Sequence, residues 1–158
     1  MRRSVALSAF VLTFAASTSL APAQAQADTP APDSLSVLSD VIGDFQTAGD
    51  YVHFSSTPPP TASAHGWWLN GSGPGTKAKV TVSLQAKDGG GNWKSVETSS
   101  KTIKPGGGSA RRANARKTCE GTAKTTWRSV VDVDVIGVRD SPSKLYTPSK
   151  TYPCGAGL

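Results

Sequence analysis

The sequence has few of the residues on which metal chemistry depends. Its 158 residues include two cysteines, Cys119 and Cys154, and two histidines, His53 and His65. They are too few and too far apart along the chain to match a four-ligand zinc pattern, so we predict no metal site. His65 follows a proline-rich stretch and is expected to be a solvated loop residue.

Catalytic patterns are equally scarce. Serines are plentiful, but residues 61–158 hold one histidine and two glutamates, and no serine lies in a nucleophile-elbow pattern. Asp132 and Asp134 share one predicted strand face, as paired glycosidase carboxylates could, but Arg128 on the same face favours a surface charge ladder. We therefore predict no catalytic residue, no cofactor and no enzymatic activity, with a hydrolase as the less favoured alternative.

Long hydrophobic runs are absent after the first twenty residues. Arg2 and Arg3 precede an apolar run from Val5 to about Leu20, and alternating alanines follow. A charged start, a short apolar core and small residues at the end are typical of a secretory signal peptide, and the run is short for a membrane span. We expect residues 1–27 to be removed and the protein to be secreted and extracellular, with an uncleaved anchor as the alternative.

Export changes the expectation for the two cysteines. In an oxidising compartment an even pair most simply forms one disulfide, here between Cys119 and Cys154. Loop entropy suggests a stabilisation of ~4 kcal/mol for a loop of this length. A pair of free thiols and a metal site are the alternatives.

Acidic residues are missing from the stretch between Glu97 and Glu120. We predict that the basic residues of this stretch form a partner-binding patch, with a solvated strand face as the alternative. Such patches often bind nucleic acid, but export favours acidic protein surfaces or anionic envelope polymers instead. The patch consists of Lys101, Lys104, Arg111, Arg112, Arg116 and Lys117.

Residues 28–60 have the opposite charge, with five acids and no lysine or arginine. Apolar residues between Leu35 and Phe45 recur at spacings of three and four, which predicts a short helix. Residues 51–55 are a short strand candidate, and Pro58 to Pro60 predict a stiff linker. We predict an acidic arm that needs a partner to cover its apolar residues, namely Leu35, Leu38, Val41, Ile42, Phe45, Tyr51, Val52 and Phe54.

Residues 61–158 have the alternation of β-strands. In residues 77–87 every second side chain is apolar, and residues 125–138 place Trp127, Val131, Val133 and Val135 on one face. Glycine and proline separate several such short strands. The predicted fold is all-β, an immunoglobulin-like antiparallel β-sandwich with an N-terminal extension that contains the short helix and strand.

Four tryptophans raise the alternative of a carbohydrate-binding module. Trp127 is expected in the core, whereas Trp67 and Trp68 are adjacent and must point to opposite sides of a strand. The runner-up function is therefore a module that binds carbohydrate or the cell envelope, or an inhibitor of an extracellular hydrolase.

Several segments resemble small secreted actinobacterial proteins, and in particular the adaptor subunits of umbrella toxin particles. The segments are Trp67-Trp68-Leu69-Asn70-Gly71, Arg112 to Cys119, Thr125 to Asp134, Asp140-Ser141-Pro142, and Cys154.

The resemblance implies a non-enzymatic role in interbacterial antagonism. The sandwich would join a lectin subunit, which has a trypsin-like domain, to a repeat-bearing toxin subunit, and the arm would insert into the lectin subunit. None of the matching segments is a catalytic signature, which agrees with the expectation reached from composition.

Overall fold

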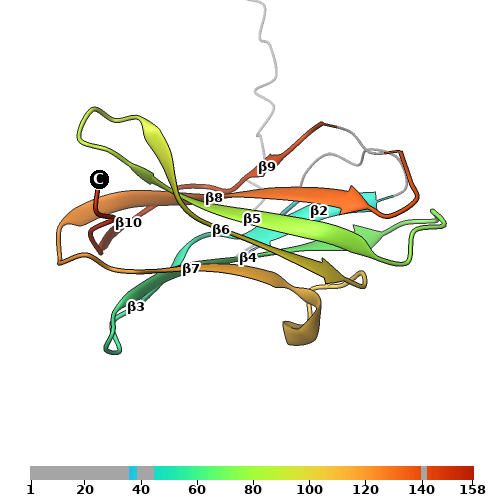
Figure 1. Cartoon of the computed structure of the whole chain (residues 1–158), viewed down its shortest axis with the longest axis horizontal. Helices are drawn as coiled ribbons and strands as arrows, with labels where there is room; N and C mark the ends of the chain where they lie inside the picture. Colours follow the sequence, from blue (N-terminus) through green and yellow to red (C-terminus); the bar gives the residue numbers. More distant parts are fainter. Residues whose placement is uncertain (1–35, 39–44, 140–141) are drawn as a thin grey trace, which may run out of the picture. The chain divides into compact units, whose positions relative to one another are not determined.

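The computed structural model describes residues 36–38, 45–139 and 142–158. These residues form two antiparallel β-sheets (Figure 1). The first sheet contains β1 (Ser36–Leu38), β2 (Phe45–Asp50), β3 (His53–Ser55), β4 (Thr61–Asn70) and β7 (Ala113–Thr118). The second contains β5 (Ala78–Lys87), β6 (Trp93–Ile103), β8 (Lys124–Val135), β9 (Leu145–Tyr146) and β10 (Lys150–Pro153). A 3-10 turn, η1 (Ser109–Arg111), precedes β7.

The core lies between the two sheets and follows the alternation read from the sequence. In β5 the five apolar residues at even positions are completely buried, and in β8 Trp127, Val131, Val133 and Val135 are buried against them. Their neighbours along each strand face outward, because successive side chains of a strand point to opposite faces. The prediction of an all-β fold built from two packed antiparallel sheets is confirmed.

The strand β8 is central in its sheet, as its apolar content predicts. It pairs with β5 on one side and with β9 and β10 on the other. Its even face is only partly covered: Val130 is buried, whereas Ile136, just beyond the strand, is 57% exposed. Within the part of the chain described, no helix has the length and apolar character that a membrane crossing requires.

Two glycines allow the sheets to approach each other closely at the centre of the core. Gly49 of β2 and Gly66 of β4 lie directly opposite each other in the first sheet. A Cβ atom built on Gly66 would lie 2.6 Å from Cγ1 of Val131 and 2.8 Å from Cγ2 of Val82. Both side chains belong to the interior of the second sheet, so neither can move far without disturbing other core contacts.

We expect Gly66→Ala to lower the free energy of unfolding by ~1–3 kcal/mol, because the added methyl overpacks the core. Urea unfolding of the disulfide-intact protein measures this change. Gly89→Ala is the matched control: nothing lies within 4 Å of a Cβ atom there, and its effect should be within about 0.5 kcal/mol. Equal midpoints for the two variants would contradict the close approach of the sheets.

The disulfide is present as predicted, between Cys119 and Cys154. It joins the end of β7 to the segment after β10, and so links the two sheets. Backbone hydrogen bonds reinforce the link, since the Glu120 N–H donates to the Gly155 carbonyl at 2.8 Å. The indole N–H of Trp127 donates to the Cys154 carbonyl at 3.2 Å, which ties the disulfide to the core.

The predicted boundary between arm and sandwich is wrong. Residues 45–50 and 53–55 belong to the first sheet, where they form β2 and β3 and both strands pair with β4. The predicted helix is also wrong at residues 36–38, which form β1 and pair with β2. The spacing of the apolar residues alone could not distinguish a helix from a strand here. Pairing with β2 provides hydrogen-bond partners for the backbone N–H and C=O groups, as a helix would.

This correction removes several residues from the predicted partner-binding arm. Phe45 is 7% exposed and Val52 is completely buried, so both serve the protein's own core. Phe54 packs against that core and stacks on Tyr152 with ring centroids 5.7 Å apart. Leu38 lies in β1, whereas the predicted signal peptide and the arm residues Leu35, Val41 and Ile42 lie outside the described residues.

Candidate functional site

A β-bulge between β2 and β3 shapes the first part of the site. Gly49 lies opposite Gly66 and His53 lies opposite Ser63, so three residues of one strand face two residues of β4. The extra residue reverses the alternation of side chains along the strand. Asp50 and His53, three residues apart, consequently both point to the outer face of the first sheet, and Val52 between them is buried.

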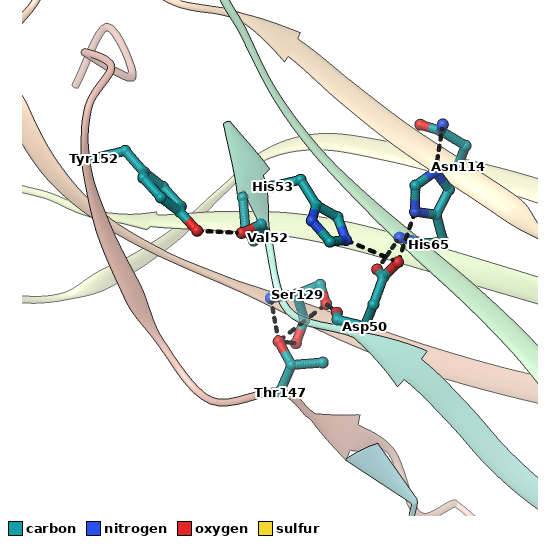
Figure 2. Close-up of polar contacts among 8 residues, drawn as sticks. All are labelled: Asp50, Val52, His53, His65, Asn114, Ser129, Thr147 and Tyr152. Carbon is teal, nitrogen blue, oxygen red and sulfur yellow. Dashed lines mark hydrogen bonds and ion pairs between the residues drawn. The ribbon is translucent and has the colours of Figure 1, made fainter. Parts of the chain in front are cut away.

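The second sheet holds the bulge in place. The hydroxyl of Ser129 donates to the Asp50 carbonyl at 3.2 Å, and the hydroxyl of Tyr152 donates to the Val52 carbonyl at 2.8 Å (Figure 2). Ser129 is completely buried, and Thr147 contacts both its backbone N–H and its hydroxyl. Hydroxyl groups from β8 and β10 therefore satisfy two carbonyls of the bulge and fix its position.

Asp50 gathers both histidines of the chain into one cluster (Figure 2). Its Oδ1 accepts the backbone N–H of His65 at 2.7 Å, and its Oδ2 lies 2.8 Å from His65 Nδ1 and 3.0 Å from His53 Nε2. On the adjacent strand, the side-chain amide nitrogen of Asn114 lies 3.1 Å from His65 Nε2. We refer to Asp50, His53, His65 and Asn114 as the carboxylate–histidine cluster.

The sequence-based expectation for His65 is wrong. His65 is a half-buried residue of β4 rather than a solvated loop residue, because the residues that follow the predicted linker form a strand. The two histidines, which are separated along the sequence, lie close together in space, with ring centroids 5.9 Å apart. The antiparallel pairing of β3 with β4 brings them together across the sheet.

The cluster favours a charged carboxylate. Burial raises the pKa of Asp50, but hydrogen bonds from the side chain and backbone of His65 and from His53 outweigh burial and hold this pKa below its usual value. A carboxyl group with a lowered pKa in the folded state contributes stability at neutral pH. This contribution is lost as the pH falls through the folded-state pKa, below about 3.9.

We expect Asp50→Asn to reduce stability at pH 7 and to weaken the dependence of stability on acid. Urea unfolding in metal-free buffer at pH 7 and at about pH 3 measures this dependence. The free energy of unfolding should fall less between the two pH values for the variant than for the natural protein. Asp134→Asn, which removes an exposed carboxylate of β8, is the control for the loss of one negative charge outside the cluster. Equal acid-induced losses in Asp50→Asn and the natural protein would show that Asp50 does not contribute in this way.

The second part of the site is a groove beside the cluster, where β6 and β7 lie at neighbouring edges of the two sheets (Figure 1). One pocket of about 390 Å³ is lined by His65, Ser99, Ser100, Lys101, Ser109, Arg112 and Asn114. A second of about 470 Å³ is lined by Lys77, Thr102, Ile103, Lys104, Ala110 and Arg111. The β6 residues of the two pockets follow one another along the strand, and we call the two together the basic groove.

The structure brings together four of the six predicted patch residues. Lys101 and Arg112 line the first pocket, and Lys104 and Arg111 line the second. Lys117 is instead paired with Glu120 at 2.6 Å. The sixth residue, Arg116, lies on β7 opposite Ser63, which in turn lies opposite His53 of the carboxylate–histidine cluster. Arg116 is not among the residues that line the two pockets.

None of the five lysines and arginines of the groove, Lys77, Lys101, Lys104, Arg111 and Arg112, forms an ion pair with a carboxylate of the described residues. Over residues 45–139 and 142–158, the lysines that pair with a carboxylate are Lys117 and Lys144, and neither lines the groove. Lys101 and Arg111 contact backbone carbonyls instead, at 3.4 Å and 3.0 Å. No aspartate or glutamate lines either pocket.

The tryptophans are placed poorly for stacking on a sugar. Trp68 and Trp127 are completely buried, and Trp67 faces the other side of β4, as predicted. Gly107 lies so close to Trp67 that a Cβ atom there would be 3.0 Å from the indole nitrogen. The ring of Trp93 is occupied by Arg128, whose guanidinium carbon is 4.2 Å from the ring centroid.

The Asp50–His65 pair has the orientation found in hydrolase triads, with the carboxylate on Nδ1 of the histidine. In a triad the other ring nitrogen contacts a nucleophile. Here His65 Nε2 contacts the amide of Asn114, which is not a nucleophile. His65 and Asn114 also line the first pocket, so the cluster and the basic groove are neighbours.

Comparison with known proteins gave no match, either to a protein-family model or to a curated protein or a solved structure.

Proposed function

We propose that the chain is a secreted, non-enzymatic adaptor that binds an acidic segment of a partner protein in the basic groove. The observation that carries this proposal is the charge of the groove: Lys101, Lys104, Arg111 and Arg112 line two successive pockets, and no carboxylate among residues 45–139 and 142–158 pairs with them. Unpaired cations of this kind steer an anionic partner and fix its register.

The edges of the sheets favour a protein over a polysaccharide. Among the strands that the structure describes, β6 pairs with β5 alone and β7 with β4 alone, so each has one backbone edge that none of these strands covers. An extended segment of a partner can pair with such an edge while its acidic side chains contact the lysines and arginines. A sugar polymer offers no matching row of backbone groups.

An adaptor needs a second surface, and we place it in the residues before β2. The likeness to umbrella toxin adaptors implies a lectin subunit with a trypsin-like domain as one partner and a repeat-bearing toxin subunit as the other. Because Phe45 and Val52 belong to the core, the proposed arm is reduced to residues 28–44. Its apolar residues are Leu35, Leu38, Val41 and Ile42.

We also propose that the sandwich is immunoglobulin-like in architecture. Two packed antiparallel sheets and a disulfide between them support this relationship. The bulged strand of β2 and β3 lies beside β4, and β4 lies beside β7, in the first sheet; the second sheet runs β10, β8, β5 and β6.

Affinity capture tests the proposed function. The tagged, secreted chain should retain a large protein partner in stoichiometric amount from the culture supernatant of its source, and raised salt should weaken the complex. On a glycan array the same protein should show no saturable binding. Saturable sugar binding without a retained protein would contradict the adaptor and favour the carbohydrate-binding alternative.

A further inference from the structure

The carboxylate–histidine cluster contains three donor groups of the kind that bind transition metals. One ligating atom from each of Asp50, His53 and His65 lies within 4.8 Å of the others. Two imidazoles and one carboxylate form a common donor set for first-row divalent ions. We propose that these three residues form a binding site for such an ion, with Zn²⁺ as the ion best suited to an oxygen–nitrogen site outside the cell.

The two distances from Asp50 require only a small adjustment. A zinc ion lies about 2.0–2.2 Å from each nitrogen or oxygen ligand, so tetrahedral ligands are about 3.3 Å apart. Oδ2 of Asp50 is now 2.8 Å from His65 Nδ1 and 3.0 Å from His53 Nε2, which are hydrogen-bond lengths. Replacing the bridging protons by an ion opens these two separations by a few tenths of an ångström, and the two histidine nitrogens already lie within 4.8 Å of each other.

The ligands differ in mobility in a way that suits capture of an ion. The side chain of Asp50 is 11% exposed and that of His65 is 24% exposed, and both are held by the bulge and by β4. His53 is 38% exposed and can turn its ring to complete the site. Three protein ligands leave a fourth position open toward solvent, as in zinc sites that bind water or an external donor.

Asn114 provides the support that a metal-bound histidine needs. In the metal-free arrangement, His65 Nδ1 carries the proton that faces Asp50, and Nε2 accepts a hydrogen bond from the Asn114 amide. When Nδ1 binds an ion, the proton resides on Nε2, and the Asn114 amide can turn to present its oxygen to this N–H. A hydrogen bond from the second ring nitrogen is the usual companion of a ligating histidine.

The composition makes the site easy to test. The chain has two histidines, both in the cluster, and its two cysteines are joined in the disulfide. Imidazole ligation can therefore come only from His53 and His65. The test needs no knowledge of the partner that binds the basic groove, so the two proposals fail separately.

The experiment is a calorimetric titration of the chelator-stripped, disulfide-intact protein with Zn²⁺, together with Cu²⁺ binding followed by electron paramagnetic resonance. We expect one saturable Zn²⁺ site and Cu²⁺ spectra with coupling to two imidazole nitrogens. His53→Gln, at the most exposed ligand, should weaken Zn²⁺ binding at least about tenfold. Asp50→Asn should weaken it as well, whereas Glu97→Gln, which removes a carboxylate of β6, should not.

Thermal melting of each metal-free variant shows whether it is folded. His53→Gln should melt close to the natural protein without metal but should lose most of the melting-temperature rise that Zn²⁺ produces. The proposal is overturned if the natural protein has no saturable site up to about 1 mM Zn²⁺. It is equally overturned if folded His53→Gln binds Zn²⁺ as tightly as the natural protein.

Discussion

Replacing both cysteines, as Cys119→Ser with Cys154→Ser, should lower the free energy of unfolding by ~4 kcal/mol or less, the largest single loss that we expect in this protein. The bond closes the loop over residues 119–154, which includes β8, β9 and β10. Without it the unfolded chain gains conformational freedom. The completely buried Cys154 also loses the link that holds its segment over Trp127.

Denaturant unfolding measures this loss, and the natural protein in excess reductant is the control. The reduced protein and the double variant should unfold at similar midpoints, both well below that of the oxidised protein. If the oxidised protein and the double variant have the same midpoint, the disulfide contributes nothing to stability.

Reversing two charges in the basic groove should weaken partner binding by about ten- to a hundredfold. Lys101→Glu with Arg112→Glu places two acids in the first pocket, where they repel the acidic segment that we propose as the ligand. The loss should lie mainly in the association rate and should shrink at high salt. Surface plasmon resonance with the captured partner measures both rates.

Lys124→Glu with Arg139→Glu is the matched control for this variant. It changes the net charge by the same amount at two exposed residues that do not line the groove. Its affinity for the partner should stay within a factor of about three of the natural value. If both double variants bind equally well, the groove is not the binding surface.

The strands that alternate most regularly were predictable because burial on one face leaves a direct record in the sequence. Val80, Val82 and Leu84 are separated by polar residues, and each side chain lies where period-2 alternation places it. The disulfide could be predicted for a different reason, since an exported chain with two cysteines has one simple pairing.

Residues 45–60 could not be placed from their own pattern. Their apolar residues are buried by β4 and by the second sheet, which are remote in sequence, so local spacing pointed to a separate arm. The bulge hid the site as well, because in a regular strand Asp50 and His53 would point to opposite faces. The sequence offered one weak signal for the site. His53 is three residues from Asp50, and His65 lies just before the strand predicted to start at Trp67.

The basic patch was predictable in composition but not in shape. The lack of acids between Glu97 and Glu120 marked the residues, and only the fold shows that Lys117 is neutralised while Lys101 and Arg112 share a pocket. The pocket depends on the close approach of β6 and β7, which belong to different sheets. The packing of strands from different sheets against each other leaves no periodic signal in the sequence of either strand.

Native mass spectrometry of the secreted protein, taken from its own medium without overexpression, tests the adaptor proposal most directly. We predict an assembly in which this chain is bound to at least one larger protein in fixed stoichiometry, and which releases the chain when the ionic strength is raised. A chain that is found only as a free monomer in that medium would contradict the proposal.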